Sequence, residues 1–168
     1  GRRAERGTAD ESLVARLVEH EFIRREPPKS TGREEFGTEY LAEVLARMDV
    51  AADDMVATLT AFTARAIGTG IRRFAIGTYG EGNLSEVWVS GGGVRNLYLM
   101  ELLRQELPGL SVAPIDELGM GVSAEAKEAL AFAVLANQSI AGRAGNLPGA
   151  TGAERPVVLG KIALGDRF

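Results

Sequence analysis

Apolar residues recur at helical spacing through the first part of the chain. Four of them follow Asp10, a residue type that caps helices well: Leu13, Val14, Leu17 and Val18. The spacing predicts a short helix over 11–19, and Thr38 can cap a second short helix over 39–47. The strongest helical pattern begins at Asp53, and its apolar face carries Met55, Val56, Leu59, Phe62, Ala66, Ile67 and Ile71. A stripe of this kind is expected to pack across a sheet or another helix.

Proline and glycine separate these helices. The segment 22–37 contains Pro27 and Pro28, which stop a helix, so a loop or connector is expected there. The segment 77–83 contains three glycines and is expected to form a turn-rich surface loop.

The pattern changes after residue 85. Val87, Trp88 and Val89 form a β-branched and aromatic run that ends at a glycine triplet, which predicts a buried strand followed by a tight turn. A helix is expected to start near Arg95 and to end before Pro108, and a second short strand is expected over 110–115. A strand, a glycine turn, a helix and a strand within about thirty residues indicate a βαβ unit with a parallel, right-handed crossover. The predicted fold class is therefore α/β.

The last third of the chain predicts one more helix and two loop-like segments. Ser123 is expected to cap a helix that carries Ala126, Leu130, Ala133, Val134 and Ile140, and its many alanines permit close packing. The segment 145–153 is rich in glycine, asparagine and proline and is expected to be a loop. The segment 156–163 is expected to be extended.

Composition and charge narrow the possible functions. The chain has 168 residues, of which 45% are hydrophobic and 25% charged, as in an ordinary globular domain. The net charge of −4 offers no basic surface for nucleic acid, and the longest apolar run, 129–136, is too short to span a bilayer. Cysteine is absent and the only histidine is His20, expected to be an ordinary surface side chain. Chemistry must therefore use carboxylates, hydroxyls, amines and backbone amides.

The glycine triplet Gly91, Gly92 and Gly93 is the first candidate site. A backbone without Cβ atoms between a strand and a helix lets a ligand approach the first helical amides, although a sterically forced turn explains glycine equally well. A dinucleotide fingerprint is a further alternative, since Gly91 and Gly93 match its first two glycines and Asp116 ends the second strand. Asn96 stands in the place of the third glycine, which weakens that match.

Acidic and basic residues supply the other candidates. Asp116 and Glu117 end the second predicted strand, where α/β proteins place ligand groups, but a solvated turn is the alternative. Glu128 lies in the alanine-rich helix and is either paired at a rim, held in a site, or simply exposed on the helix surface. The segment 29–33, with Lys29, Ser30 and Arg33, either binds an anion, ties two lobes together or is a solvated connector.

Five segments taken together resemble one known family. They are Pro-Pro-Lys-Ser-Thr-Gly-Arg-Glu at 27–34, Val-Ser-Gly-Gly-Gly-Val-Arg-Asn at 89–96, Asp-Glu-Leu-Gly at 116–119, Ala-Lys-Glu-Ala-Leu-Ala-Phe-Ala at 126–133, and Gly-Asn-Leu-Pro at 145–148 with Thr-Gly-Ala at 151–153. In this order they resemble the C-terminal half of the anhydro-N-acetylmuramic acid kinase family. The resemblance implies the C-terminal lobe of an actin-like ATPase (ribonuclease H-like) fold, shared with other sugar kinases and heat-shock ATPases, in which two lobes close on ATP.

The resemblance also implies an activity. Members use ATP, with Mg²⁺, and water to convert 1,6-anhydro-N-acetylmuramic acid to N-acetylmuramic acid 6-phosphate, opening the anhydro ring and phosphorylating O6. The reaction recycles cell-wall sugar, so a bacterial cytoplasmic enzyme is expected. Its partners would be the small sugar and ATP, with neither nucleic acid nor membrane, and a homodimer of the parent protein is expected.

The resemblance assigns roles to particular residues. Gly91, Gly92, Gly93 and Asn96 correspond to the turn that approaches the adenosine part of the nucleotide, and Glu128 corresponds to the carboxylate that hydrogen-bonds the sugar. The family's phosphate loop, of the type Asp-Gly-Thr-Ser-x-Asp-Gly, and its Asp-Thr-Gly-Pro-Gly-Asn segment with the general base are both missing from these residues. No catalytic residue and no metal ligand is therefore expected in this chain.

The domain organisation follows from the same comparison. Residues 1–38 are expected to form an N-terminal helix and connector, and residues 39–168 the C-terminal kinase lobe, with the N-terminal lobe absent. The chain alone is expected to be inactive. The alternatives are a non-catalytic nucleotide- or sugar-binding module of the same fold and, third, a dinucleotide-binding domain.

Overall fold

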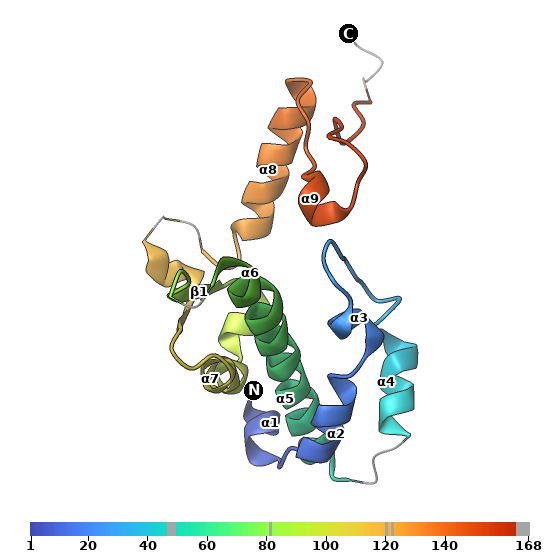
Figure 1. The fold of residues 1–168 in the computed structure, drawn as a ribbon, viewed down its shortest axis with the longest axis vertical. Helices are drawn as coiled ribbons and strands as arrows, with labels where there is room; N and C mark the ends of the chain where they lie inside the picture. Colours follow the sequence, from blue (N-terminus) through green and yellow to red (C-terminus); the bar gives the residue numbers. More distant parts are fainter. Residues whose placement is uncertain (47–49, 81, 120, 122, 164–168) are drawn as a thin grey trace. The chain divides into compact units, whose positions relative to one another are not determined.

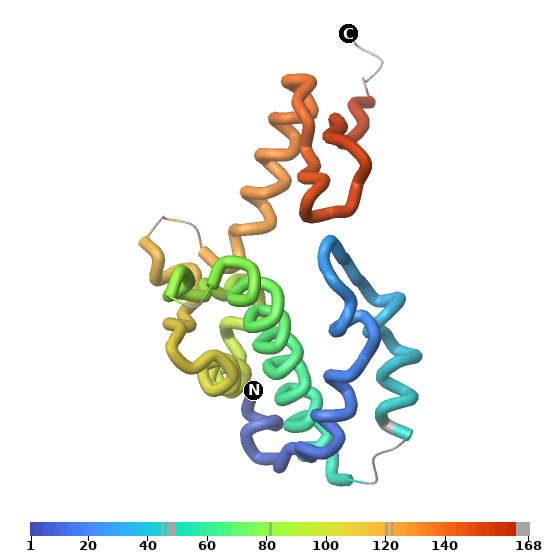
Figure 2. Tube along the Cα trace, viewed as in Figure 1, coloured from blue at the N-terminus to red at the C-terminus, as the bar shows by residue number. Residues whose placement is uncertain are grey.

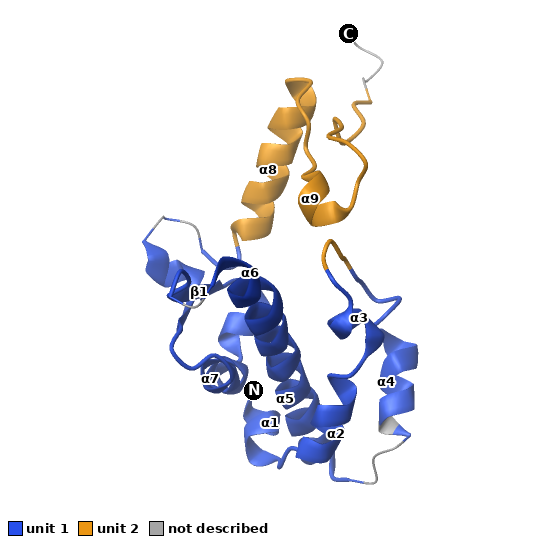
Figure 3. Cartoon of the chain, viewed as in Figure 1, with its two compact units in different colours: residues 1–26, 31–125 blue, residues 27–30, 126–168 orange. Residues whose placement is uncertain are grey.

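The chain forms two compact units. The structure is a computed structural model that describes residues 1–46, 50–80, 82–119, 121 and 123–163. Unit 1 comprises Gly1–Glu26 and Thr31–Glu125, and unit 2 comprises Pro27–Ser30 and Ala126–Phe168 (Figure 3). The expected boundary of the kinase lobe between residues 38 and 39 stays a prediction.

Unit 1 is built around one long helix. Four short helices come first: α1 (Arg2–Arg6), α2 (Glu11–Leu17), α3 (Glu21–Arg24) and α4 (Thr38–Leu45). The long helix α5 (Ala52–Gly70) follows, and Figure 1 shows α1 and α2 beside its first half. The chain then continues without a break through the π-helix η1 (Ile71–Ile76) into α6 (Gly77–Tyr79), a path visible in Figure 2. The expected loop over 77–83 therefore begins only after Tyr79.

Asp10 joins α2 to α5, as its capping position predicts. Its carboxylate accepts a hydrogen bond from the Leu13 amide at 2.9 Å, and its own amide donates to Thr58 Oγ1 at 3.0 Å. The hydrogen bond from the Ser12 hydroxyl, and then that from the Leu13 amide, lower the pKa of Asp10. Behind this cap the first core cluster contains Leu13, Val14, Leu17, Ile23, Val44, Ala61 and Phe62. The predicted helix over 11–19 is confirmed as Glu11–Leu17.

His20 is not the ordinary surface residue that the sequence suggested. Its Nδ1 accepts a hydrogen bond from the Phe22 amide at 3.2 Å and caps α3, so a helix lies inside the segment expected to be a loop. Its ring packs against Phe36 and Tyr40 with centroid distances of 4.8 and 5.4 Å, and only 23% of the side chain is exposed. Histidine was overlooked because Ser, Thr, Asp and Asn are the usual capping residues.

The second expected helix is also present, with a different start. It is α4, preceded by Gly37 at the N-cap, so Thr38 lies in the first turn and makes no capping hydrogen bond. The end of the expected span at Arg47 lies outside the described residues.

The predicted strand, helix and strand are confirmed. Strand β1 (Glu86–Val89) pairs in parallel with β2 (Ser111–Pro114), and α7 (Leu97–Glu106) connects them. A single 3₁₀ turn, η2 (Gly92–Arg95), begins within the glycine triplet and leads to α7. Their core contains Ala64, Met100, Leu103, Leu107 and Val112. Helices and a small parallel sheet together give the α/β character that the sequence predicted.

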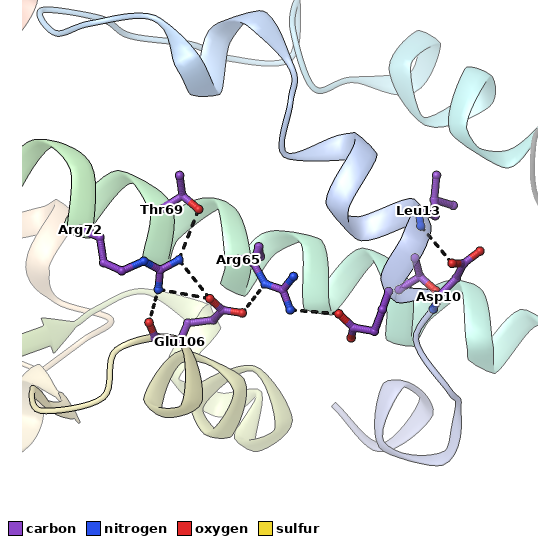
Figure 4. A network of polar contacts seen from close by, with 8 residues as sticks. Asp10, Leu13, Arg65, Thr69, Arg72 and Glu106 are labelled. Carbon is purple, nitrogen blue, oxygen red and sulfur yellow. Dashed lines mark hydrogen bonds and ion pairs between the residues drawn. The ribbon is translucent and has the colours of Figure 1, made fainter.

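An ion-pair network fixes α7 against α5 (Figure 4). The carboxylate of Glu106 contacts the guanidinium of Arg65 and lies 3.2 Å from Nη2 of Arg72. Arg65 also donates to Glu11 of α2 at 3.0 Å. The hydrogen bond to Glu106 raises the pKa of Arg65 above its usual value. Because Glu106 is the last residue of α7, the network holds the end of this helix against α5 and η1.

Unit 2 contains α8 (Lys127–Ile140) and α9 (Pro148–Thr151). Helix α8 begins at Lys127 rather than directly after Ser123, and α9 lies inside the segment expected to be a loop. The segment 156–163 was expected to be extended, and it forms no strand. It is held by Asn146, whose amide group donates to the Arg155 carbonyl at 3.0 Å and accepts from the Val157 amide at 2.6 Å.

The apolar side chains of unit 2 lie largely at the surface. No residue of α8 is buried, and Phe132 and Ile140 are 70% and 77% exposed. The other large exposed apolar residues of this unit are Leu130, Val134, Leu147, Val157, Val158, Leu159 and Ile162. The alanine-rich helix was expected to permit close packing, but among its residues only Leu135, Gln138 and Ser139 are half-buried, and the Ser139 hydroxyl contacts the Leu159 carbonyl.

Candidate functional site

The carboxyl ends of the two strands form one edge. Val89 pairs with Pro114 at the last position of the parallel register, so the segments that follow both strands start side by side. After β1 comes the glycine turn, and after β2 comes the 3₁₀ helix η3 (Ile115–Leu118), which carries Asp116 and Glu117. Ligands of α/β proteins bind outside this edge of a parallel sheet.

Only one of the three glycines is required by the chain's own backbone. Gly91 has a φ of +83°, a conformation that residues with a Cβ atom rarely adopt. Gly92 has no such φ, and a Cβ added there would meet nothing within 4 Å. A Cβ at Gly93 would make an ordinary contact with Leu99 at 3.7 Å. The open backbone at Gly92 therefore suits a group that approaches from outside.

The same turn presents two backbone donors. Gly92 and Gly93 are the first residues of η2, and helix geometry provides no acceptor within the helix for their amides. Within the described part of the chain, neither amide donates a hydrogen bond. An electronegative atom that reached the open backbone at Gly92 could accept from both.

Asn96 serves the fold of this turn. Its side-chain oxygen caps α7 by accepting from the Leu99 amide at 3.0 Å. It also borders an open depression of about 240 Å³, whose other lining residues are Val56, Leu59, Thr60, Thr63 and Leu99. The sequence singled out Asn96 but not the α5 residues beside it, because they are 33 or more positions earlier and carry only a core pattern.

Asp116 and the glycine turn meet at Ala124. The Asp116 carboxylate accepts from the Ala124 amide at 3.1 Å, and the Ala124 carbonyl accepts from the Gly91 amide at 3.1 Å. Ala124 is only 4% exposed. Next to it, Glu125 forms an ion pair with Arg95 of η2. Sequence reasoning left Asp116 without a role and missed Ala124, since nothing in its residue type marks a backbone bridge.

Glu128 belongs to unit 2. It lies in the first turn of α8, where a negative charge suits the helix dipole, and its side chain is exposed. Among the described residues its carboxylate has no hydrogen-bond or ion-pair partner. Apart from this favourable charge at the start of α8, no contact of the described residues explains an acid at this position.

The segment around Lys29 and Ser30 is part of unit 2 as well. A Cβ added at Gly152 would lie 3.6 Å from Pro28 Cγ, so two of the five matched segments adjoin each other there. Arg33 belongs to unit 1. The structure thus brings Gly91, Gly92, Gly93, Asn96 and Asp116 to one edge and holds Glu128 in the other unit.

Metal ligands and membrane-spanning helices are the next features to consider in the described residues. None of them form a cluster of three or more metal-ligating side chains. None of the helices they form has both the length and the apolar character needed to cross a bilayer.

The strand, open glycine turn, helix and strand define an α/β protein, and the carboxyl ends of its strands form the kind of edge at which such proteins bind ligands. Comparison with known proteins is more specific: the family model described as anhydro-N-acetylmuramic acid kinase matches residues 1–165. The chain belongs to the anhydro-N-acetylmuramic acid kinase family, which confirms the resemblance drawn from the five segments.

Curated relatives agree with this assignment. The protein named anhydro-N-acetylmuramic acid kinase from Salinibacter ruber is 40% identical over 167 residues, which are 98% of this chain and 41% of the relative. The protein of that name from Caldanaerobacter subterraneus subsp. tengcongensis is 38% identical over 167 residues, with the same two coverages. One from Bacillus cereus is 38% identical over 163 residues, which are 96% of this chain and 42% of the relative. The chain thus spans about two fifths of the length of these relatives.

Proposed function

We propose that this chain is one lobe of a kinase that uses ATP and water to convert 1,6-anhydro-N-acetylmuramic acid to N-acetylmuramic acid 6-phosphate. The observation that carries the proposal is the family match over residues 1–165. The same match favours a kinase over a dinucleotide-binding domain. The α/β character of the chain is consistent with the lobe of an actin-like ATPase, which is the fold we propose for it.

Within this proposal the glycine turn contacts the adenosine part of ATP. The open backbone at Gly92 and the two amides without acceptors support this role for Gly91, Gly92 and Gly93. Asn96 would act beside them from the N-terminus of α7. Mg²⁺ would be held mainly by the phosphates and by residues outside this chain, since the described residues offer no cluster of ligands.

Glu128 is the proposed sugar ligand. A carboxylate that is exposed and unpaired within the described chain is free to accept hydrogen bonds from sugar hydroxyls. The surrounding unit supports a further part of the proposal: the exposed apolar residues of α8 would be covered by the remaining lobe of the enzyme. A cytoplasmic location and a homodimer of the full protein are expected from the family and belong to the same proposal.

The decisive test is ADP release by the full-length protein with Mg²⁺, ATP and 1,6-anhydro-N-acetylmuramic acid. We expect turnover that depends on the sugar, because the family is named for this substrate. A well-folded protein without turnover would instead favour a non-catalytic binding module. Tighter binding of a nicotinamide dinucleotide than of ATP would favour the dinucleotide-binding domain.

Replacing Gly92 by leucine should weaken ATP binding without unfolding the protein. The new side chain meets no atom of this chain within 4 Å at its Cβ, yet it would occupy the space proposed for the nucleotide. We expect the KM for ATP to rise about tenfold or more, because a steric block removes well-packed contacts worth at least about 1.4 kcal/mol. Steady-state kinetics at saturating sugar measure this.

The matched control is Gly70→Leu in α5, where an added Cβ also meets nothing within 4 Å. It should leave the KM for ATP unchanged. Equal ATP affinities for wild type and Gly92→Leu, with both proteins folded by circular dichroism, would remove the glycine turn from the proposed nucleotide site.

A further inference from the structure

A chain of backbone and side-chain contacts links Asp116 to the glycine turn. The Asp116 carboxylate accepts from the Ala124 amide, and the Ala124 carbonyl accepts from the Gly91 amide, each at 3.1 Å. These contacts connect the residues after β2 with those after β1 at the same edge of the sheet. Neither contact belongs to a regular helix or strand, so no repeating ladder of hydrogen bonds supports it.

The bridge depends on Asp116 because Ala124 is buried. At 4% exposure its amide has little access to water, and a buried amide without an acceptor costs free energy. Another contact between these segments is the ion pair of Arg95 with Glu125, whose side chains are both well exposed. Exposed ion pairs contribute little, so the Asp116 hydrogen bond is the stronger restraint on the segment around Ala124.

The bridge also determines the direction in which the backbone amides of the glycine turn point. The Gly91 amide donates its hydrogen bond to the Ala124 carbonyl, and the positive φ of Gly91 turns the chain. The direction of the next two amides, those of Gly92 and Gly93, follows from the orientation of the Gly91 peptide. Without its tether, a glycine-rich turn samples many conformations, because glycine is the least restricted residue.

We infer that Asp116 is a positioning residue for nucleotide binding: its carboxylate holds Ala124, and Ala124 holds Gly91, so that the turn is preorganised for its ligand. The inference rests on the proposed function for the identity of that ligand. Asp116 acts through hydrogen-bond acceptance and not through its charge. It does not touch the ligand, in contrast to an acid that would hold a cation or the ribose directly.

Three variants of the full-length protein separate these roles. Asp116→Ala removes the acceptor and should raise the KM for ATP about tenfold, with a smaller change in the KM for the sugar. Asp116→Asn keeps a side-chain oxygen at the same position without the charge and should restore ATP binding to near the wild-type value. Glu154→Ala removes an exposed acid of unit 2, away from the glycine turn in the sequence, and should have no effect.

Amide hydrogen exchange provides a readout that does not depend on activity. The amides of Ala124 and Gly91 should exchange faster in Asp116→Ala than in wild type, and at the wild-type rate in Asp116→Asn. Asp116→Ser, whose hydroxyl is on a shorter side chain, loses the same contact and serves as a second variant if alanine impairs folding. Its exchange and kinetics should follow those of Asp116→Ala.

The outcomes distinguish this inference from the proposed function. If asparagine is as damaging as alanine, the charge matters and the positioning role is wrong. Unchanged exchange at Ala124 and Gly91 in Asp116→Ala also overturns it. Calorimetric titration of the wild type with ATP tests the ligand separately: absence of binding rejects the proposed function and the nucleotide role of Asp116 with it, whereas wild-type binding that Asp116→Ala leaves unchanged rejects only the inference about Asp116.

Discussion

The 168-residue chain by itself should form no ADP from ATP and 1,6-anhydro-N-acetylmuramic acid, whereas the full-length protein should. Phosphoryl transfer needs in-line positioning and neutralisation of phosphate charge, and ring opening needs an activated water molecule. The described residues contain no cluster of metal-ligating side chains, and the chain spans about two fifths of its relatives' length. The family's phosphate loop and general-base segment are absent from the sequence. Under the proposed function, this chain supplies contacts to the substrates and the rest of the protein completes the reaction centre.

A coupled assay of ADP release, with the purified chain and the full-length protein at equal concentration, measures the difference. Circular dichroism of the isolated chain establishes that it is folded under the assay conditions. The exposed apolar residues of α8 make this check necessary, because an uncovered patch promotes association. Sugar-dependent ADP formation that increases with the concentration of the isolated chain would contradict the proposed division of labour.

Local sequence pattern was enough for the elements around the candidate edge. Residues 87–89 are a short β-branched and aromatic run that ends at glycines, which indicates a strand, whereas the leucines after Asn96 recur every three to four residues, which indicates a helix. The order strand, turn, helix, strand then leaves a parallel pair as the simple solution. Helix α5 was predicted for the same reason, since its stripe covers two cores.

The errors occur where tertiary contacts decide the backbone. Helix α3 has only four residues and depends on a histidine cap within an aromatic cluster, which no local period reveals. Ser123 lies four residues before Lys127, the first residue of α8, because an acceptable cap residue does not by itself start a helix. The segment 156–163 was expected to be extended from its residue types; it forms no strand, and Asn146 accepts a hydrogen bond from the Val157 amide within it.

The candidate site was likewise predictable from the sequence only in part. The sequence suggested a tight turn at Gly91, and the positive φ of this residue explains why it is glycine. Only the structure shows that neither φ nor crowding within the chain requires glycine at position 92. Asp116 needed Ala124 as its partner, and a buried alanine carries no chemical signal in a sequence. Glu128 was chosen from a resemblance to a family segment, and its exposed, unpaired carboxylate is compatible with that role.

Replacing Glu128 by glutamine should lower sugar-dependent turnover of the full-length protein on the order of a hundredfold. Hydrogen bonds to a charged group contribute about 1.5–3 kcal/mol, and the upper end of that range corresponds to roughly a hundredfold. Glutamine has almost the same shape but lacks the charge, so the packing of α8 should not change. The thermal unfolding midpoint should fall only slightly, because the change removes the favourable charge in the first turn of α8 and no other contact of the described residues.

The measurement is the ratio kcat/KM for the sugar at saturating ATP, together with the KM for ATP. The value of kcat/KM for the sugar should fall while the KM for ATP stays the same, because Glu128 is proposed to contact the sugar and not the nucleotide. Glu154→Gln is the matched control: it makes the same chemical change at another exposed position of unit 2 and should keep wild-type kinetics. If Glu128→Gln turns over the sugar as fast as wild type, the acid belongs to the surface of α8, as the pattern of the helix alone allows, and the sugar site must be sought elsewhere.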